Sequence, residues 1–253
     1  MKTLVMKFGG AALETPEHFG NIAEIICEKE GRVVVVVSAM GNVTDELTSL
    51  VHQVAKNPSK REMDMLLSVG ERISMSLLAM ALEERNIPAI SLTGSQSGII
   101  TCNRHNEAFI QDVRPIRIQK HLDEGKVVIV AGFQGVSSEK EITTLGRGGS
   151  DTSAVALAAA LHAEKVEFYK DVEGIYSKDP KKDPKATLIS ELSFKQALRF
   201  PEFVLHKRAT LLASKNGLPL HIKSFKKEDR ERFPGTWIYA DVMEKGPVYE
   251  DYF

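Results

Sequence analysis

The segment "TTLGRGGSDTSA" (143–154) combines three glycines and one arginine just before an alanine-rich run. Gly146, Gly148 and Gly149 can take backbone conformations that point several N–H groups at one anion. The N-terminus of the helix expected after them adds partial positive charge. Arg147 can hold a carboxylate or phosphate at two points. A simple glycine turn explains the glycines but not the arginine, so we expect an anion-binding loop.

The polar residues that follow this loop have two possible roles. Ser150, Asp151 or Thr152 can cap the helix by accepting a hydrogen bond from its first N–H groups. Asp151 can instead receive an ammonium group of a ligand. The alanines between Ala154 and Ala160 favour a helix that packs closely on a sheet.

Three further segments place chemically capable residues where a strand or helix is interrupted. In "KFGG", Lys7 can reach a phosphate while the amides of Gly9 and Gly10 donate to it; the alternative is a plain turn with a surface lysine. In "SAMGNVTDEL" (38–47), Thr44 can contact a ligand, or Thr44 or Asn42 can cap a helix.

The third segment is Gly70-Glu71-Arg72, which holds the only charges between Leu66 and Leu82. A glutamate in so apolar a stretch is costly to bury unless it is paired. Glu71 can therefore face a cleft and receive a substrate ammonium group. The alternative is a local break in the helix that brings both charges to the surface.

The elements that must position these residues follow an alternating pattern. β-branched or apolar runs predict strands at 2–8, 32–40, 88–94, 126–133, 165–172, 219–225 and 235–242, and a hairpin at 98–111. Helical spacing predicts helices at 16–30, 43–56, 61–85 and 114–125, a helix after the glycine-rich segment, and two short helices near the end. This pattern indicates an α/β fold with a mostly parallel sheet covered on both faces. Ligands of such sheets bind at the carboxyl ends of the strands.

Composition limits the function classes. The chain has 253 residues, a formal net charge of −1, 43% hydrophobic and 26% charged residues. This suits one large domain, with or without a small lobe, and gives no reason to expect nucleic acid or a membrane as partner. Two cysteines, Cys27 and Cys102, and the lack of an export signal fit the cytoplasm.

Several known site patterns are missing. The sequence contains no G-x-x-x-x-G-K-[ST] phosphate loop and no G-x-G-x-x-G after the first strand. Gln96 in "GSQSG" stands where a nucleophile elbow needs serine. The seven histidines include no H-x-x-x-H pair, so we expect no protein-built metal site.

Together and in this order, the segments resemble the amino-acid kinase family, and within it the aspartokinase catalytic domains. The likeness runs from Lys7 to about Ile238. Its stretches are "KFGGAAL", "VVSAMGNVTDEL", "SVGERIS", "SLTGSQSGIIT", "AGFQG", "TTLGRGGSDTSAVALAAAL", "YKDVEGIYSKDP", "VLHKRA" and "FPGTWI". The glycine-rich arginine motif and "DVEGIYSKDP" are specific to the family, whereas "KFGG" alone is not.

The resemblance implies transfer of the γ-phosphoryl group of ATP, accompanied by Mg²⁺, to the side-chain carboxylate of L-aspartate. The product, 4-phospho-L-aspartate, begins the route to lysine, threonine and methionine. The implied fold is a three-layer αβα sandwich around a mainly parallel sheet of about eight strands. A catalytic domain at 1–240 would comprise a substrate lobe (about 1–150) and a nucleotide lobe (about 151–240). A tail at 241–253, no ACT regulatory domain, no feedback by lysine or threonine, a cytoplasmic location and a homodimer complete the expectation.

The resemblance also implies roles for individual residues. Lys7 with the Gly9 and Gly10 amides would stabilise the transferred phosphoryl group. Arg147 would clamp the α-carboxylate of aspartate, and Glu71 and Asp151 would receive its ammonium group. Thr44 would lie near the reacting carboxylate. The full set is Lys7, Gly9, Gly10 and Asp151 for catalysis; Thr44, Glu71, Arg147, Gly148, Gly149, Ser150 and Asp151 for the substrate; and Lys7, Gly10, Lys170, Asp171, Tyr176, Asp179 and Lys181 for the nucleotide.

The chain departs from the family pattern at several positions. Ala11 and Ala12 replace hydroxyl residues of "KFGGTS", and Lys170 precedes Asp171 where the family has threonine. Phe203 replaces a nucleotide-facing lysine, with Lys207 four residues on. Two alternatives therefore remain: a kinase for another acid, such as glutamate or an aspartate analogue, and a nucleotide-binding regulatory protein without catalysis.

Overall fold

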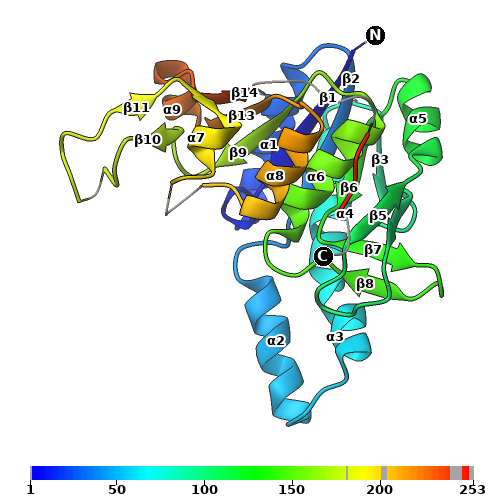
Figure 1. Ribbon diagram of the computed structural model, residues 1–253. Coiled ribbons are helices and arrows are strands. Elements are labelled where there is room, and N and C mark those ends of the chain that lie inside the picture. The colour runs from blue at the N-terminus through cyan, green and yellow to red at the C-terminus, as the bar shows by residue number, and fades with distance from the viewer. Residues whose placement is uncertain (1, 181, 201–203, 240–246, 251–253) are drawn as a thin grey trace.

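β-branched strands form the centre of the molecule (Figure 1). The computed structural model describes residues 2–180, 182–200, 204–239 and 247–250. In β2 (Arg32–Val37) the five valines are all buried, which requires cover on both faces of the sheet. The side chains of Val34 and Val36 join one core cluster, and those of Val33, Val35 and Val37 join the other.

The main sheet has eight strands within the described residues, in the order β12-β14-β13-β9-β1-β2-β6-β3. All neighbours pair in parallel except β13 and β14, which are antiparallel. The predicted mainly parallel sheet is confirmed. Because β1 lies between β2 and β9, strands from both halves of the chain share this sheet. The division into two lobes near residue 150 stays a prediction.

Helices cover both faces of the sheet, which confirms the three-layer sandwich (Figure 1). α5, α6 and α8 pack on one face, and α1 and α4 pack on the other. The element bounds are β1 Thr3–Phe8, α1 Pro16–Cys27, α2 Val43–Val54, α3 Lys60–Leu67, α4 Val69–Glu83, β3 Ala89–Leu92, β4 Ile99–Thr101, β5 Ile110–Val113, α5 Ile116–Asp123, β6 Val127–Ala131, β7 Gln134–Ser137, β8 Ile142–Thr144, α6 Gly149–Ala160, β9 Lys165–Lys170, β10 Ile175–Tyr176, β11 Leu188–Ile189, β12 Glu191–Ser193, α7 Phe194–Ala197, α8 Lys207–Lys215, β13 Leu220–Ser224, α9 Lys227–Arg232 and β14 Thr236–Tyr239.

A second, four-stranded sheet lies beside the main one, in the order β5-β4-β7-β8. β4 and β5 are antiparallel and confirm the hairpin predicted at 98–111. The β7–β8 hairpin was not predicted, because its strands have only four and three residues. It matters for the site, because β8 ends at Thr144, just before the glycine-rich loop.

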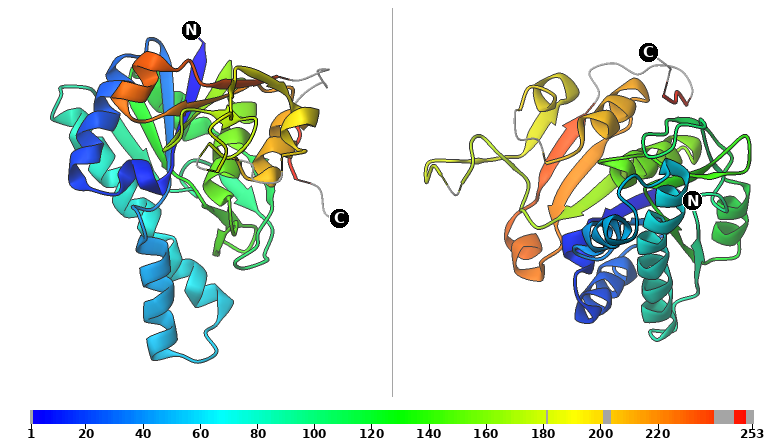
Figure 2. Two further views of the ribbon diagram at one scale, coloured as in Figure 1. Left: turned by 90° about the vertical axis from the view of Figure 1, so that its left-hand side faces the viewer. Right: turned by 90° about the horizontal axis from the view of Figure 1, so that it is seen from below.

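The predicted helix at 61–85 consists of α3 and α4, which meet at Ser68. This stretch, Lys60–Glu83, is long and apolar enough to cross a membrane by length and composition. Here Leu78 and Leu82 of α4 are fully buried against the sheet, as in a core helix of a globular domain. α2 and α3 project beyond the sandwich (Figure 2).

Candidate active site

The carboxyl ends of β1 and β2 meet the N-terminus of α6 around one cavity of about 580 Å³. Parallel strands bring their ends to the same edge, which is why segments far apart in the sequence converge here. Of the residues predicted for catalysis and substrate binding, those lining this cavity are Lys7, Gly10, Thr44, Glu71, Arg147, Gly148, Gly149, Ser150 and Asp151. Gly9 lies directly beside them, since a Cβ on it would be 3.7 Å from Lys7 Nζ.

Three charged side chains form a cluster in which Lys7 and Asp151 are buried and line the cavity, and Lys170 is partly buried beside them. Lys7 Nζ lies 2.6 Å from Asp151 Oδ1, and Lys170 Nζ lies 3.3 Å from Asp151 Oδ2. Burial alone would raise the pKa of Asp151, but Lys7 and Lys170 outweigh it and lower that pKa below its ordinary range. Burial lowers the pKa of Lys7, an effect that Asp151 opposes. One carboxylate thus holds two lysines side by side and leaves the cluster positively charged.

Glu71 also lines the cavity, close enough to Lys7 for each charge to affect the pKa of the other. Its side chain is 3% exposed, and its Oε1 accepts a hydrogen bond from the N–H of Ala39 (3.1 Å). Burial raises the pKa of Glu71 to about 7. Hydrogen bonds from its own N–H and from the N–H of Ala39, and the positive charge of Lys7, act in the opposite direction but are outweighed. Gly70 makes the approach possible, because a Cβ there would lie 2.8 Å from Cβ of Ala39. The alternative in which Glu71 reaches the surface is therefore wrong.

The glycine-rich loop takes the conformation that its glycines permit. Gly146 and Gly148 have φ values of 71° and 72°, in the left-handed region. A side chain on Gly148 would also collide with the ring of His206. Gly148 precedes the first residue of α6, and no side chain caps that helix. The alternative role of Asp151 as a cap is therefore wrong. Arg147 projects from the loop and remains exposed.

Two further residues predicted to contact a ligand, Gly10 and Thr44, follow β1 and β2 in the chain. A Cβ on Gly10 would lie 3.0 Å from the carbonyl oxygen of Ala39, so only glycine lets the two strand-to-loop junctions touch. Thr44 lies inside α2 rather than at its cap, and its side chain does not cap the helix. Thr44 therefore faces the cavity as predicted for a ligand contact.

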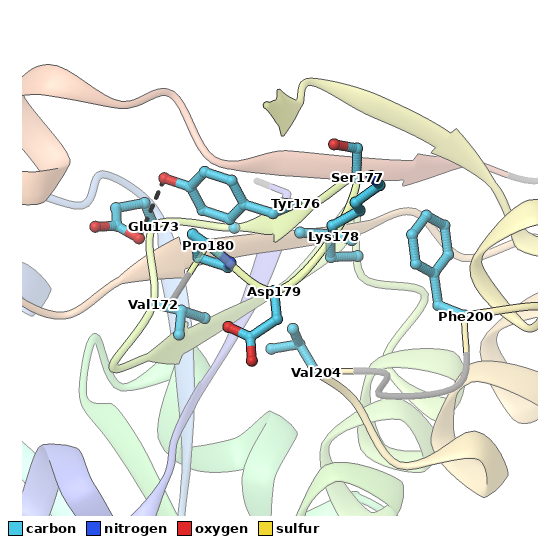
Figure 3. A pocket seen from close by; sticks show the side chains of 11 residues that line it. Val172, Glu173, Tyr176, Ser177, Lys178, Asp179, Pro180, Phe200 and Val204 are labelled. Carbon is cyan, nitrogen blue, oxygen red and sulfur yellow. Dashed lines mark hydrogen bonds between the residues drawn. The ribbon is translucent and has the colours of Figure 1, made fainter. Parts of the chain in front are cut away.

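A second cavity of about 360 Å³ opens beside β10 (Figure 3). Tyr176 and Asp179, both predicted for the nucleotide, line it together with Val172, Phe200 and Val204. The Tyr176 hydroxyl donates to Glu173 (3.4 Å). Asp171 lines a different, neighbouring cavity, next to Ala11. Lys181 and Phe203 lie outside the described residues.

Sequence reasoning missed Asp64, which supports the substrate side of the site. This fully buried carboxylate accepts hydrogen bonds from Thr144 Oγ1 (2.5 Å), and from the backbone N (3.1 Å) and Nδ2 (2.6 Å) of Asn106. His105 Nδ1 lies 2.7 Å from its other oxygen. Thr144 and Asn106 line the cavity, so Asp64 fixes part of its wall. Asp64 lies on α3 and Glu71 lies on α4, so no periodicity within one helix singled Asp64 out.

The arrangement suits two anions that react with each other. Lys7, with Lys170 beside it, offers positive charge, and Arg147 offers a bidentate donor to the same cavity. Glu71 adds an acceptor for a cationic group. A small zwitterion with an extra acidic group can therefore place its charged ends on Arg147 and Glu71, and its acidic side chain toward the lysines.

The chain is similar to known proteins of one family. The amino acid kinase family model matches residues 2–224. The aspartokinase of Geobacillus stearothermophilus is 47% identical, over 99% of this chain and 64% of that protein. The chain thus spans less than two thirds of the length of that curated relative.

Two solved structures share the fold. The aspartate kinase from Synechocystis superposes with a TM-score of 0.86 at 43% identity, over 98% of this chain and 42% of that one. E. coli aspartokinase III, in complex with aspartate and ADP, gives a TM-score of 0.84 at 28% identity, over 95% of this chain and 65% of that one. With nearly nine tenths of its residues matched by the family model and the fold shared throughout, the chain belongs to the amino acid kinase family.

Proposed function

We propose that the chain transfers the γ-phosphoryl group of ATP to the side-chain carboxylate of L-aspartate, giving 4-phospho-L-aspartate and ADP. The observation that carries the proposal is that Lys7, Asp151, Arg147 and Glu71 line one cavity, with Lys170 paired to Asp151 behind it. The aspartokinase relatives support it, as does the E. coli structure in complex with aspartate and ADP.

The proposed reaction requires no general base. A carboxylate oxygen of the substrate forms a bond to the γ-phosphorus, and the bond to the β,γ-bridging oxygen breaks, so that ADP leaves with the electron pair. Positioning and charge stabilisation therefore supply most of the catalysis. Lys7 and Lys170 would neutralise charge on the transferred group, with the Gly9 and Gly10 amides donating to it. Asp151 would orient both lysines.

The amino acid would be held by its α-substituents. Arg147, on a loop whose Gly148, Gly149 and Ser150 border the same cavity, would bind the α-carboxylate. Glu71 would receive the ammonium group. Thr44 would lie beside the reacting carboxylate. Asp151 was also predicted to receive the ammonium group, but its two lysine partners favour the orienting role.

The nucleotide would extend from the lysines toward the cavity beside β10. Tyr176 and Asp179 line that cavity, Asp171 lies next to it, and we also propose Lys181 as a contact. Mg²⁺ would arrive with ATP. Asp151 and Glu71 already have protein partners, which fits an ion held mainly by phosphate oxygens and water.

Hydroxylamine trapping of acyl phosphate tests the proposal, with L-aspartate and L-glutamate in parallel. Arg147→Ala should lower kcat/KM for aspartate at least about 100-fold, because a charge-assisted bidentate contact is lost. Arg117→Ala, on the exposed side of α5, should leave the rate unchanged. Product from glutamate alone, or from neither acid, would contradict the proposal.

The proposal extends to the cellular setting. We propose the first step toward lysine, threonine and methionine as its place in metabolism, and the cytoplasm as its location. Both cysteines are free thiols, which supports a reducing compartment. We also propose a homodimer, because Ile73, Leu77 and Met80 leave an apolar stripe exposed on α4. Sedimentation analysis of the chain tests the dimer, and a monomer at micromolar concentration would contradict it.

A further inference from the structure

Arg208 of α8 connects three separate parts of the chain. Its Nε and Nη2 pair with the carboxylate of Glu250. Its Nη1 donates to the carbonyl of Leu145 (2.6 Å), and its Nη2 donates to that of Ala108 (2.6 Å). The guanidinium also lies 4.9 Å from the ring centre of Phe109. Both charged side chains are largely buried, at 18% and 10% exposure, so solvent screens the pair little.

The segment that contributes Glu250 is held along its length. Asn216, the residue that follows α8, forms two reciprocal hydrogen bonds with the backbone of Val248 (2.8 and 2.7 Å). Glu250 N–H donates to the carbonyl of Ile110 (3.2 Å), and its Oε2 accepts from Ile110 N–H (2.8 Å). Residues 248–250 therefore bind across α8 and β5, and Glu250 is fixed where it meets Arg208.

The carbonyl that Arg208 holds belongs to the last residue before the glycine-rich loop. Leu145 N–H donates to Phe133 (2.9 Å), so both polar backbone groups of Leu145 are fixed. The next residues are Gly146, Arg147 and Gly148, and both glycines have positive φ. Because glycines give a loop little stiffness of their own, its direction depends on how its first peptide group is held.

We propose that Arg208, itself held by Glu250, is a positioning residue that fixes the loop carrying Arg147. It touches neither substrate nor nucleotide and acts through the carbonyl of Leu145. Its effect on catalysis rests on the proposed function, in which Arg147 binds the α-carboxylate. Through this contact, the segment at 248–250 is coupled to amino acid binding on the far side of the loop.

Two variants of the 253-residue chain test the coupling. Glu250→Gln keeps the size of the side chain but removes the charge that holds Arg208, and Arg208→Lys keeps the charge but cannot reach two carbonyls at once. Amide hydrogen exchange of Gly149, whose N–H donates to Gly146, reports on the loop without any reaction. We expect exchange about tenfold faster, and KM for aspartate about tenfold higher, with kcat and KM for ATP nearly unchanged.

Glu167→Gln is the matched control, because Glu167 is also a buried glutamate paired with basic side chains, but it lies on β9 and does not contact the loop. It should leave loop exchange and KM for aspartate unchanged. Unchanged loop exchange in both test variants would overturn the positioning role, as would faster exchange with an unchanged KM for aspartate. The wild-type chain could make no product from aspartate while both variants still exchange faster. That outcome would keep the positioning role and reject the proposed function.

Discussion

Glu71 changes its charge near neutral pH, because burial raises its pKa to about 7. If it receives the ammonium group of the substrate, it must be ionised to do so. The same pKa shift makes the folded state less stable, not more, as pH rises. The unfolded chain ionises Glu71 near the ordinary pKa of 4.5. The contribution of Glu71 to stability therefore declines as pH rises between about 4.5 and about 7.

We predict that KM for aspartate falls as pH rises from 6 to 8. The ionised fraction of Glu71 should rise from about one tenth to about nine tenths over this range, so KM should fall by roughly tenfold. Initial rates at each pH measure this. In Glu71→Gln, KM should be high and independent of pH. A pH dependence that survives in that variant would assign the titration to another group.

Individual site residues were predictable from the sequence where their residue type contrasted with that of their sequence neighbours. Arg147 stands between glycines and Glu71 lies in an apolar run, and both line the cavity. Asp64 gave no such signal, because it sits among the other charged residues of "KREMDMLL". Its partners, Asn106 and Thr144, are about 40 and 80 residues away along the chain, so only the folded chain shows that it is buried. Arg208 and Glu250 escaped notice for the same reason.

At the scale of elements, α6 shows why small residues follow the glycine-rich loop. Every residue from Gly149 to Ala159 is buried, between the sheet and α8. Ala154, Ala156 and Ala158 have no exposed surface, so the helix axis lies close to the strands. This close approach places the N-terminus of α6, and with it Asp151, within reach of Lys7 on β1.

We predict that Ala156→Leu destabilises the fold by about 1–3 kcal/mol, because extra methylene groups have no space in so tight a contact. Ala160→Leu is the matched control, since Ala160 is partly exposed on the same helix. It should change the free energy of unfolding much less. Urea denaturation of both variants measures the difference, and equal losses would mean that the contact is looser than the structure shows.

The elements themselves were predictable in proportion to their length. The strand predicted at 32–40 and the helix predicted at 43–56 are long enough for their patterns of apolar residues to be recognised. Both form within a few residues of the predicted bounds. β7 and β8 are too short to show alternation and form through pairing with each other. α9 is a helix of only six residues, none of them fully buried.

For the molecule as a whole, a second buried charge cluster contributes to stability outside the active site. Glu167 of β9 pairs with Lys29 (3.2 Å) after α1 and with Lys165 (3.0 Å), and it accepts a hydrogen bond from Tyr169 (2.8 Å). Burial would raise the pKa of Glu167, but Lys29, Lys223 and Lys165 together lower it to about 2. The cluster joins α1, β9 and β13 on the face opposite α6.

We predict that Glu167→Gln lowers the free energy of unfolding at pH 7 by up to about 3 kcal/mol, the value that the pKa difference gives for loss of the charge alone. A carboxylate with a lowered pKa stabilises the fold above its ordinary pKa of about 4.5, and this contribution is lost as pH falls toward 2. Urea denaturation should therefore show a smaller difference from wild type at pH 3. The exposed Glu164→Gln should show little change at either pH.

The position of β1 in the sheet has a consequence for how the molecule is made. β1 leaves the ribosome before the other strands of this sheet, and β2 follows it closely, but its other partner is β9, with Leu4 opposite Lys165. At roughly 5–20 residues per second, an apolar strand edge stays open for on the order of ten to thirty seconds of synthesis. Lys7 has no Asp151 to pair with during most of this time, because Asp151 is synthesised about 140 residues later. The ion pair between Lys7 and Asp151 therefore forms late, and until then the open edge of β1 could pair with another chain.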